Sequence, residues 1–105
     1  MQAFDTEVDY TKANVQNILE HFTQFQQNAE QGNTDAVVLI VDIKEATKKA
    51  KLTDQQKKVY FYRFLREYTQ DEVAEIMDIS QQAISKHVEL IVLKIYRELN
   101  GGDQQ

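Results

Sequence analysis

Residues 69–88 read TQDEVAEIMDISQQAISKHV, and this stretch decides the fold. Thr69 followed three positions later by Glu72 forms a capping box, which predicts the start of a short helix. Asp78 and Ile79 then predict a tight turn, and Ser80 is a suitable N-cap for a second, longer helix. Two helices joined by a turn of three or four residues make a helix-turn-helix, so the pattern predicts that motif here.

The apolar residues of this stretch stand where a helix-turn-helix needs them. The two helices cross closely, and the small side chain of Ala74 suits the crossing. Ile79 fills the space inside the turn, and Ile84 anchors the second helix from below. The second helix continues to about residue 99, and its apolar positions recur at helical spacing. We predict that its buried stripe consists of Ile84, Val88, Ile91, Ile95 and Leu99.

The first turns of the second helix carry polar residues in the positions that a helix-turn-helix exposes. These candidate site residues are Gln81, Gln82, Ser85 and Lys86. Glutamine can form two hydrogen bonds with an adenine edge, serine can donate or accept, and lysine can reach guanine or a phosphate. The alternative is a structural helical hairpin whose polar face is merely solvated. We favour nucleic-acid recognition because the packing residues and the polar residues both fit the motif.

A third helix is predicted immediately upstream. Thr53 and Gln56 form another capping box, and Leu52 can pack as a hydrophobic staple, so this helix begins at Asp54 and runs to about residue 67. Its segment 59–65 is dense in aromatic residues. These rings offer either a platform for stacking bases or a packed core. The helical spacing and the lack of interleaved basic residues favour the core.

Two more helices are predicted in residues 11–50. The first begins at Thr11 and fades near residues 28–32, and its apolar stripe is Val15, Ile18, Leu19, Phe22 and Phe25. Asn33 can cap the second. Its segment 36–41 also resembles a buried strand, but the chain has no second run for it to pair with. The fold is therefore predicted to be all-α, a small bundle of about five helices with a C-terminal helix-turn-helix.

Charge divides the chain into two regions. The net charge is −5, but residues 51–100 hold eight basic and eight acidic side chains, whereas residues 1–50 hold four and eight. A neutral module gains little from phosphate neutralisation, so it should bind a nucleic acid weakly on its own. We predict an acidic N-terminal helical region at 1–50 for dimerisation or partner docking, and a helix-turn-helix domain at 51–100.

Several classes of function are excluded by composition. The chain has no cysteine, which rules out disulfides and thiolate metal sites and fits a reducing, cytoplasmic compartment. The longest apolar run has six residues, far below the about 20 of a membrane span, and the first residues do not resemble a secretory signal. No nucleophile with a base and no glycine-rich phosphate loop is present, so we expect no enzyme activity, no cofactor and no metal.

Residues 50–99 resemble region 4 of the bacterial sigma-70 family, and also small phage-type regulators that carry this region alone. The resemblance rests on LTDQQ at 52–56, YTQDEVAEI at 68–76 and ISQQAISKHV at 79–88. It implies a helical bundle that reads a promoter element in double-stranded DNA and touches the flap of RNA polymerase. It also implies that Gln81, Gln82, Ser85 and Lys86 face bases, and that the segment from Thr69 through Gln70 to Asp71, with Arg63 and Arg66, lies near phosphates. The family's usual turn glycine is replaced by Asp78, and residues 1–50 resemble no promoter-melting region.

Two hypotheses follow. The first is a sequence-specific DNA-binding transcription regulator that gains affinity from RNA polymerase or from a homodimer formed by its N-terminal helices. The candidate surface for such contacts is the apolar stripe of the first helix together with segment 37–43. The alternative is a protein-interaction adaptor or inhibitor that keeps the fold but acts through its acidic N-terminal helices.

Overall fold

The structure, a computed structural model, describes residues 10–101, and this part of the chain is all helical, as predicted. It contains six α-helices where about five were expected, and one π-helical segment, η1. The elements are α1 (Lys12–Glu20), α2 (Phe22–Glu30), α3 (Thr34–Lys49), α4 (Asp54–Tyr60), η1 (Phe61–Leu65), α5 (Gln70–Met77) and α6 (Gln81–Leu99).

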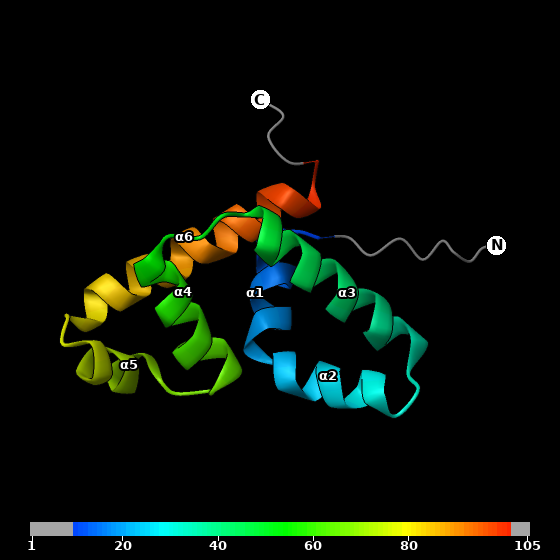
Figure 1. Ribbon diagram of the computed structural model, residues 1–105, viewed down its shortest axis with the longest axis horizontal. Coiled ribbons are helices and arrows are strands. Elements are labelled where there is room, and N and C mark those ends of the chain that lie inside the picture. Colours follow the sequence, from blue (N-terminus) through cyan, green and yellow to red (C-terminus); the bar gives the residue numbers. More distant parts are fainter. Residues whose placement is uncertain (1–9, 102–105) are drawn as a thin grey trace.

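The helices form two arms that share one long helix (Figure 1). One arm is the antiparallel pair α2–α3, and the other consists of α4, η1 and α5. Helix α6 runs along both arms, and α1 descends between them. Helix α6 therefore packs against α1, α3, α4 and α5.

A single buried cluster connects the two arms. The stripe of α6 is buried as predicted at Ile84, Val88, Ile91 and Ile95, while Leu99 is only partly buried. The same cluster contains apolar side chains from the N-terminal helices and from α4 and η1, namely Val15, Leu19, Phe22, Ile43, Val59 and Phe64. Since apolar burial is the main stabilising term in folding, the N-terminal helices contribute to the stability of the helix-turn-helix that they contact.

The first predicted helix is broken at His21. Its backbone (φ −119°, ψ 28°) leaves the helical region, and its N–H bonds back to the carbonyls of Asn17 and Ile18. The break turns the chain so that α2 can pack along α3 while Phe22 remains buried. The hydrophobic stripe does not reveal the break, because the apolar positions before and after His21 recur at the same helical spacing.

Helix α3 confirms the choice of helix over strand for segment 36–41. The side chain of Asn33 accepts a hydrogen bond from the N–H of Ala36 at 3.0 Å, which is the predicted N-cap. Lys48 and Lys49 lie in the last turn, where the helix dipole favours cations.

The third predicted helix is shorter than expected. Its capping box at Thr53 and Gln56 is present, but the α-helical pattern ends at Tyr60 and gives way to η1. In η1 the N–H of Arg66 bonds to the carbonyl of Phe61, five residues back, at 2.9 Å. This wider turn buries Phe64 and leaves Phe61 44% exposed. The predicted helix therefore ends at Leu65, two residues before the expected end near residue 67, and its last five residues are π-helical.

The predicted docking surface on the first helix is also wrong, because most of its residues are in the core. The buried members are Ile18, Leu19 and Phe22 from the first stripe, and Ile40 and Ile43 from segment 37–43. A side chain that is buried in the core of its own chain cannot contact a partner. The apolar residues that α3 does expose are Val37, Val38 and Val41.

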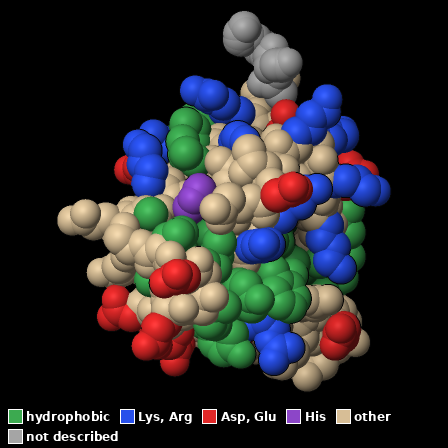
Figure 2. All heavy atoms as spheres, turned by 60° about the vertical axis from the view of Figure 1, so that its left-hand side comes forward, with side chains coloured by type: hydrophobic (Ala, Val, Ile, Leu, Met, Phe, Trp, Pro, Cys, Tyr) green, Lys and Arg blue, Asp and Glu red, His purple; other side chains and the backbone are tan. Residues whose placement is uncertain are grey.

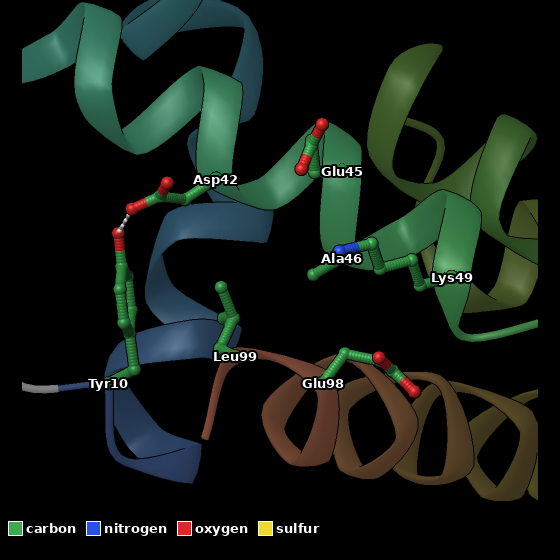
Figure 3. A pocket seen from close by; sticks show the side chains of 7 residues that line it. All are labelled: Tyr10, Asp42, Glu45, Ala46, Lys49, Glu98 and Leu99. Atoms are coloured by element: carbon green, nitrogen blue, oxygen red, sulfur yellow. Dashed lines mark hydrogen bonds between the residues drawn. The ribbon is translucent and has the colours of Figure 1, made fainter. Parts of the chain in front are cut away.

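Tyr10 connects the start of the described chain to α3 and to the C-cap of α6. Its hydroxyl donates to Asp42 Oδ2 on α3 at 2.6 Å, and its carbonyl accepts from Asn100 Nδ2 at 3.0 Å. Figure 3 shows the tyrosine hydroxyl pointing at Asp42, and both residues line a cavity that Glu98 and Leu99 line from the side of α6. The volume of this cavity is about 210 Å³. Burial, with the hydrogen bond to Asp42 and the charge of that carboxylate, raises the pKa of Tyr10.

This contact predicts a stability change at high pH. The pKa of Tyr10 is higher in the folded than in the unfolded chain, where it is about 10. Its contribution to stability is therefore complete below pH about 10 and is lost as the pH rises towards the folded value. We expect Tyr10→Phe to lower the free energy of unfolding by about 1 kcal/mol at neutral pH. The variant should also lose less stability than the wild type above pH 10, as measured by urea unfolding.

Tyr96→Phe is the matched control, since Tyr96 is partly buried in the same bundle. Its urea midpoint should follow the wild type over the whole pH range. If Tyr10→Phe loses as much stability above pH 10 as the wild type does, the inferred contribution of the Tyr10 hydroxyl is wrong.

Candidate nucleic-acid interface

The turn of the predicted helix-turn-helix is formed by Asp78 in a left-handed conformation (φ 57°, ψ 46°). Its N–H bonds to the carbonyl of Glu75, and the N–H of Ile79 bonds to that of Ala74 at 3.1 Å. Aspartate tolerates this conformation better than most residues, which explains how it replaces glycine here. Ser80 caps α6 as predicted by accepting from the N–H of Ala83 at 3.0 Å.

The first two turns of α6 present a polar strip to solvent. Ile84 stands between these residues in the sequence but faces the core, where it is fully buried. The rotation of the helix about its axis is therefore fixed. All four predicted base-facing residues are exposed: Gln81, Gln82, Ser85 and Lys86. In the described part of the chain, the side chains of Gln81, Gln82 and Ser85 form no hydrogen bond. Their donors and acceptors therefore remain available to a ligand.

Lys86 is the one predicted contact in this strip that has a charged neighbour. Its Nζ lies 3.4 Å from Oε1 of Glu89, three residues further along α6. Both side chains are largely exposed, at 68% and 72%. Pairs of this kind are weak, typically below about 1 kcal/mol, so Glu89 does not prevent Lys86 from contacting an anion.

Some of the groups predicted to contact phosphates at the start of α5 already form hydrogen bonds within that helix. The Oγ1 of Thr69 accepts from the N–H of Glu72 at 3.1 Å, and Glu72 accepts from the N–H of Thr69 at 2.8 Å. This is the predicted capping box. The hydroxyl proton of Thr69 can still be donated to a phosphate, and Gln70 is partly exposed beside it.

The two predicted phosphate-contacting arginines differ in their surroundings. Arg66 is exposed at the end of η1. The side chain of Arg63 is only 19% exposed, and its Nη2 lies 3.1 Å from Oε1 of Glu20 on α1. Sequence reasoning missed this partner, because a contact across 43 positions leaves no local pattern. The structure therefore brings Arg63 close to the start of α5 but gives it an intramolecular counter-ion.

Acidic side chains flank the strip on the side of α5. Helix α5 and its C-cap carry Asp71, Glu72, Glu75 and Asp78, which are all exposed. Figure 2 shows this side of the molecule, with Asp and Glu gathered at the lower left and Lys and Arg spread over the upper part. The local field is therefore mixed, and it lacks the uniform positive potential that would attract DNA from a distance.

Other kinds of site find no support in the described residues. No group of three or more histidine, aspartate or glutamate side chains there is arranged to hold a metal ion. None of the helices in residues 10–101 is long and apolar enough to cross a membrane.

The fold and the exposed polar strip define a helix-turn-helix of the DNA-binding class. Residues 50–97 match the family described as Sigma-70, region 4, a span that contains α4, η1, α5 and nearly all of α6. Over these residues the chain is similar to sigma-70 region 4, as the resemblance implied. The match links this part of the chain to DNA binding in transcription, and the matched family is not one of enzymes. No curated protein and no solved structure matched the chain.

Proposed function

We propose that the protein is a sequence-specific transcription regulator that reads the major groove with the first two turns of α6. The observation that carries this proposal is the strip of Gln81, Gln82, Ser85 and Lys86, whose side chains stand exposed on a helix that the core holds in place. Recognition helices of this motif contact base edges with the residues at their N-terminal end. In this proposal, Arg66, Thr69 and Gln70 contact the DNA backbone.

The proposed division of the chain is functional. Residues 51–100 provide the DNA-reading module, and residues 1–50 provide a surface for a second copy of the chain. A separate folding unit is not implied, because side chains from both regions share one core cluster. The mixed charge around the strip means that one module gains little from phosphate neutralisation. The second contact is RNA polymerase or another copy of the chain.

A contact with RNA polymerase is favoured by apolar surface inside the region 4 match. Phe61 and Leu65 of η1 are 44% and 37% exposed, and the ring of Tyr62 packs edge-on against Phe61. Exposed aromatic and aliphatic side chains next to one another are typical of protein interfaces.

Selection from random DNA duplexes tests the DNA-reading proposal. We expect the wild type to enrich one sequence at low salt, and Gln82→Ala to lose preference at one position by about 1–3 kcal/mol. If Lys86 touches a phosphate, Lys86→Ala should lower affinity for all sequences and reduce the salt dependence by roughly one ion. Lys48→Ala removes the same charge at the far end of α3 and should leave both quantities unchanged. Failure to enrich any sequence, with or without RNA polymerase, would refute the proposal.

The proposed homodimer uses the exposed valines of α3. Val37, Val38 and Val41 are 41%, 47% and 53% exposed and form one strip on the helix. A second copy that packs antiparallel about a two-fold axis covers the valines of both copies.

The expected dimer is weak. Helix α3 has 16 residues and is about 24 Å long, so a contact through it alone falls below the about 1,200 Å² of a standard interface. Two linked half-sites on DNA would raise the effective concentration of the second copy and stabilise the pair.

Sedimentation velocity over a range of concentrations tests the dimer. Val41→Asp should shift the monomer–dimer equilibrium to monomer, because a charge replaces an apolar side chain at the centre of the contact. The matched control is Ala13→Asp, which adds the same charge at an exposed position of α1. A wild type that stays monomeric, with or without DNA, would contradict this mode of pairing.

The second candidate function is an adaptor or inhibitor that acts through the N-terminal region. The excess of acidic residues in 1–50 and the exposed valines of α3 favour it. It predicts that Gln82→Ala and Lys86→Ala leave function intact while Val41→Asp abolishes it. Loss of function in Gln82→Ala and Lys86→Ala supports the DNA-reading regulator, whatever the effect of Val41→Asp.

A further inference from the structure

Arg63 is held by contacts from two sides. Its Nη2 donates to Glu20 on α1 at 3.1 Å, and its Nη1 donates to the carbonyl of Tyr68 at 3.5 Å. Its guanidinium carbon lies 5.6 Å from the ring centre of Phe64. The Nε is buried and has no hydrogen-bond partner. The carboxylate of Glu20 therefore neutralises the charge of the guanidinium, but its one bonded oxygen does not satisfy all of the N–H donors of Arg63.

The position of Arg63 is close to where a DNA backbone would pass. Tyr68, whose carbonyl it contacts, immediately precedes Thr69, the N-cap of α5. The first helix of a helix-turn-helix crosses the DNA backbone, and helix N-termini and arginines are frequent donors to phosphate oxygens. A groove of about 660 Å³, lined by residues that include Glu20, Thr23 and Arg63, leaves the pair open to solvent.

A second bond fastens the N-terminal helices to the same loop. The hydroxyl of Thr23 on α2 donates to Oε2 of Glu67. Glu67 has a left-handed backbone (φ 63°) and lies in the short connection from η1 to α5. Two residues outside the region 4 match therefore hold two residues inside it, one in η1 and one on the connection that precedes the N-cap of α5.

We propose that Glu20 is an intramolecular substitute for a DNA phosphate and that the α1–α2 unit lowers DNA affinity by occupying Arg63. Carboxylate and phosphate bind a guanidinium with the same donor geometry, so they compete for it. The pair is partly exposed, at 19% and 31%, which makes it weak enough to exchange. This inference rests on the proposed DNA-binding function and adds a regulatory element: a partner that draws Glu20 away strengthens DNA binding.

The test measures binding of the full-length chain to a fluorescently labelled random-sequence duplex by anisotropy, over a series of salt concentrations. A random duplex is suitable because phosphate contacts dominate non-specific affinity. Glu20→Gln should bind roughly three- to tenfold more tightly at low salt, and the plot of log affinity against log salt should steepen by about 0.9 for the one added phosphate contact. Glu30→Gln makes the same change of charge on α2, at an exposed position, and should not steepen the plot.

A double-mutant cycle shows whether the gain passes through Arg63. The double variant Glu20→Gln with Arg63→Gln should bind like the wild type and without the steeper salt slope, because no arginine remains to make the added phosphate contact. Thermal unfolding verifies that each variant is folded.

The outcomes separate this inference from the proposed function. If neither the wild type nor Glu20→Gln binds DNA, the DNA-reading function itself is wrong. If the wild type binds but Glu20→Gln equals Glu30→Gln, or keeps its gain without Arg63, the inference about Glu20 is refuted and the function stands.

Discussion

The packing of α6 is the constraint on which the rest of the structure depends. One stripe, from Ile84 to Ile95, is shared by the helix-turn-helix and by the N-terminal helices. Because that stripe is buried, the rotation of α6 is fixed and its first turns can only face outward. The exposed position of Gln82 and Lys86 is therefore a consequence of the packing of Ile84 and the rest of the stripe on the opposite face of the helix. The same packing places α1 next to η1, where the contact between Glu20 and Arg63 becomes possible.

Local signals in the sequence predicted the helix ends well. The capping residues at 33, 53, 69 and 80 all act as N-caps, and Asp78 adopts the left-handed turn. These features depend on side chains within three or four positions of one another, so the sequence contains all the information that they need. The buried stripe of α6 was predictable for the same reason, since its helical period can be read directly.

Features that depend on distant contacts were not predictable. The break at His21 and the π-helical turn of η1 both adjust where a helix points, and neither disturbs the spacing of apolar residues. The apolar stripe of α1 looked like a docking surface because periodicity shows which face is apolar but not what covers it. The pairing of Arg63 with Glu20 joins residues 43 positions apart, so only the fold reveals that this arginine has a counter-ion.

The proposed function is one of weak modules acting together. A recognition strip with one lysine, flanked by the acidic residues of α5, relies on shape and hydrogen bonding rather than on charge. The N-terminal helices then have two opposing effects: they complete the core, and Glu20 supplies a negative charge next to the DNA-facing side. Such an arrangement keeps affinity low until a second contact is made, which suits a regulator that must act only in the presence of a partner.

The most direct test of the central claim is a titration of isotope-labelled protein with its selected DNA duplex, followed by amide chemical shifts. The account predicts that the largest changes cluster at residues 69–70 and 81–86, with small changes in α2 and in the exposed strip of α3. Changes concentrated in the N-terminal helices, with the first turns of α6 unaffected, would contradict it.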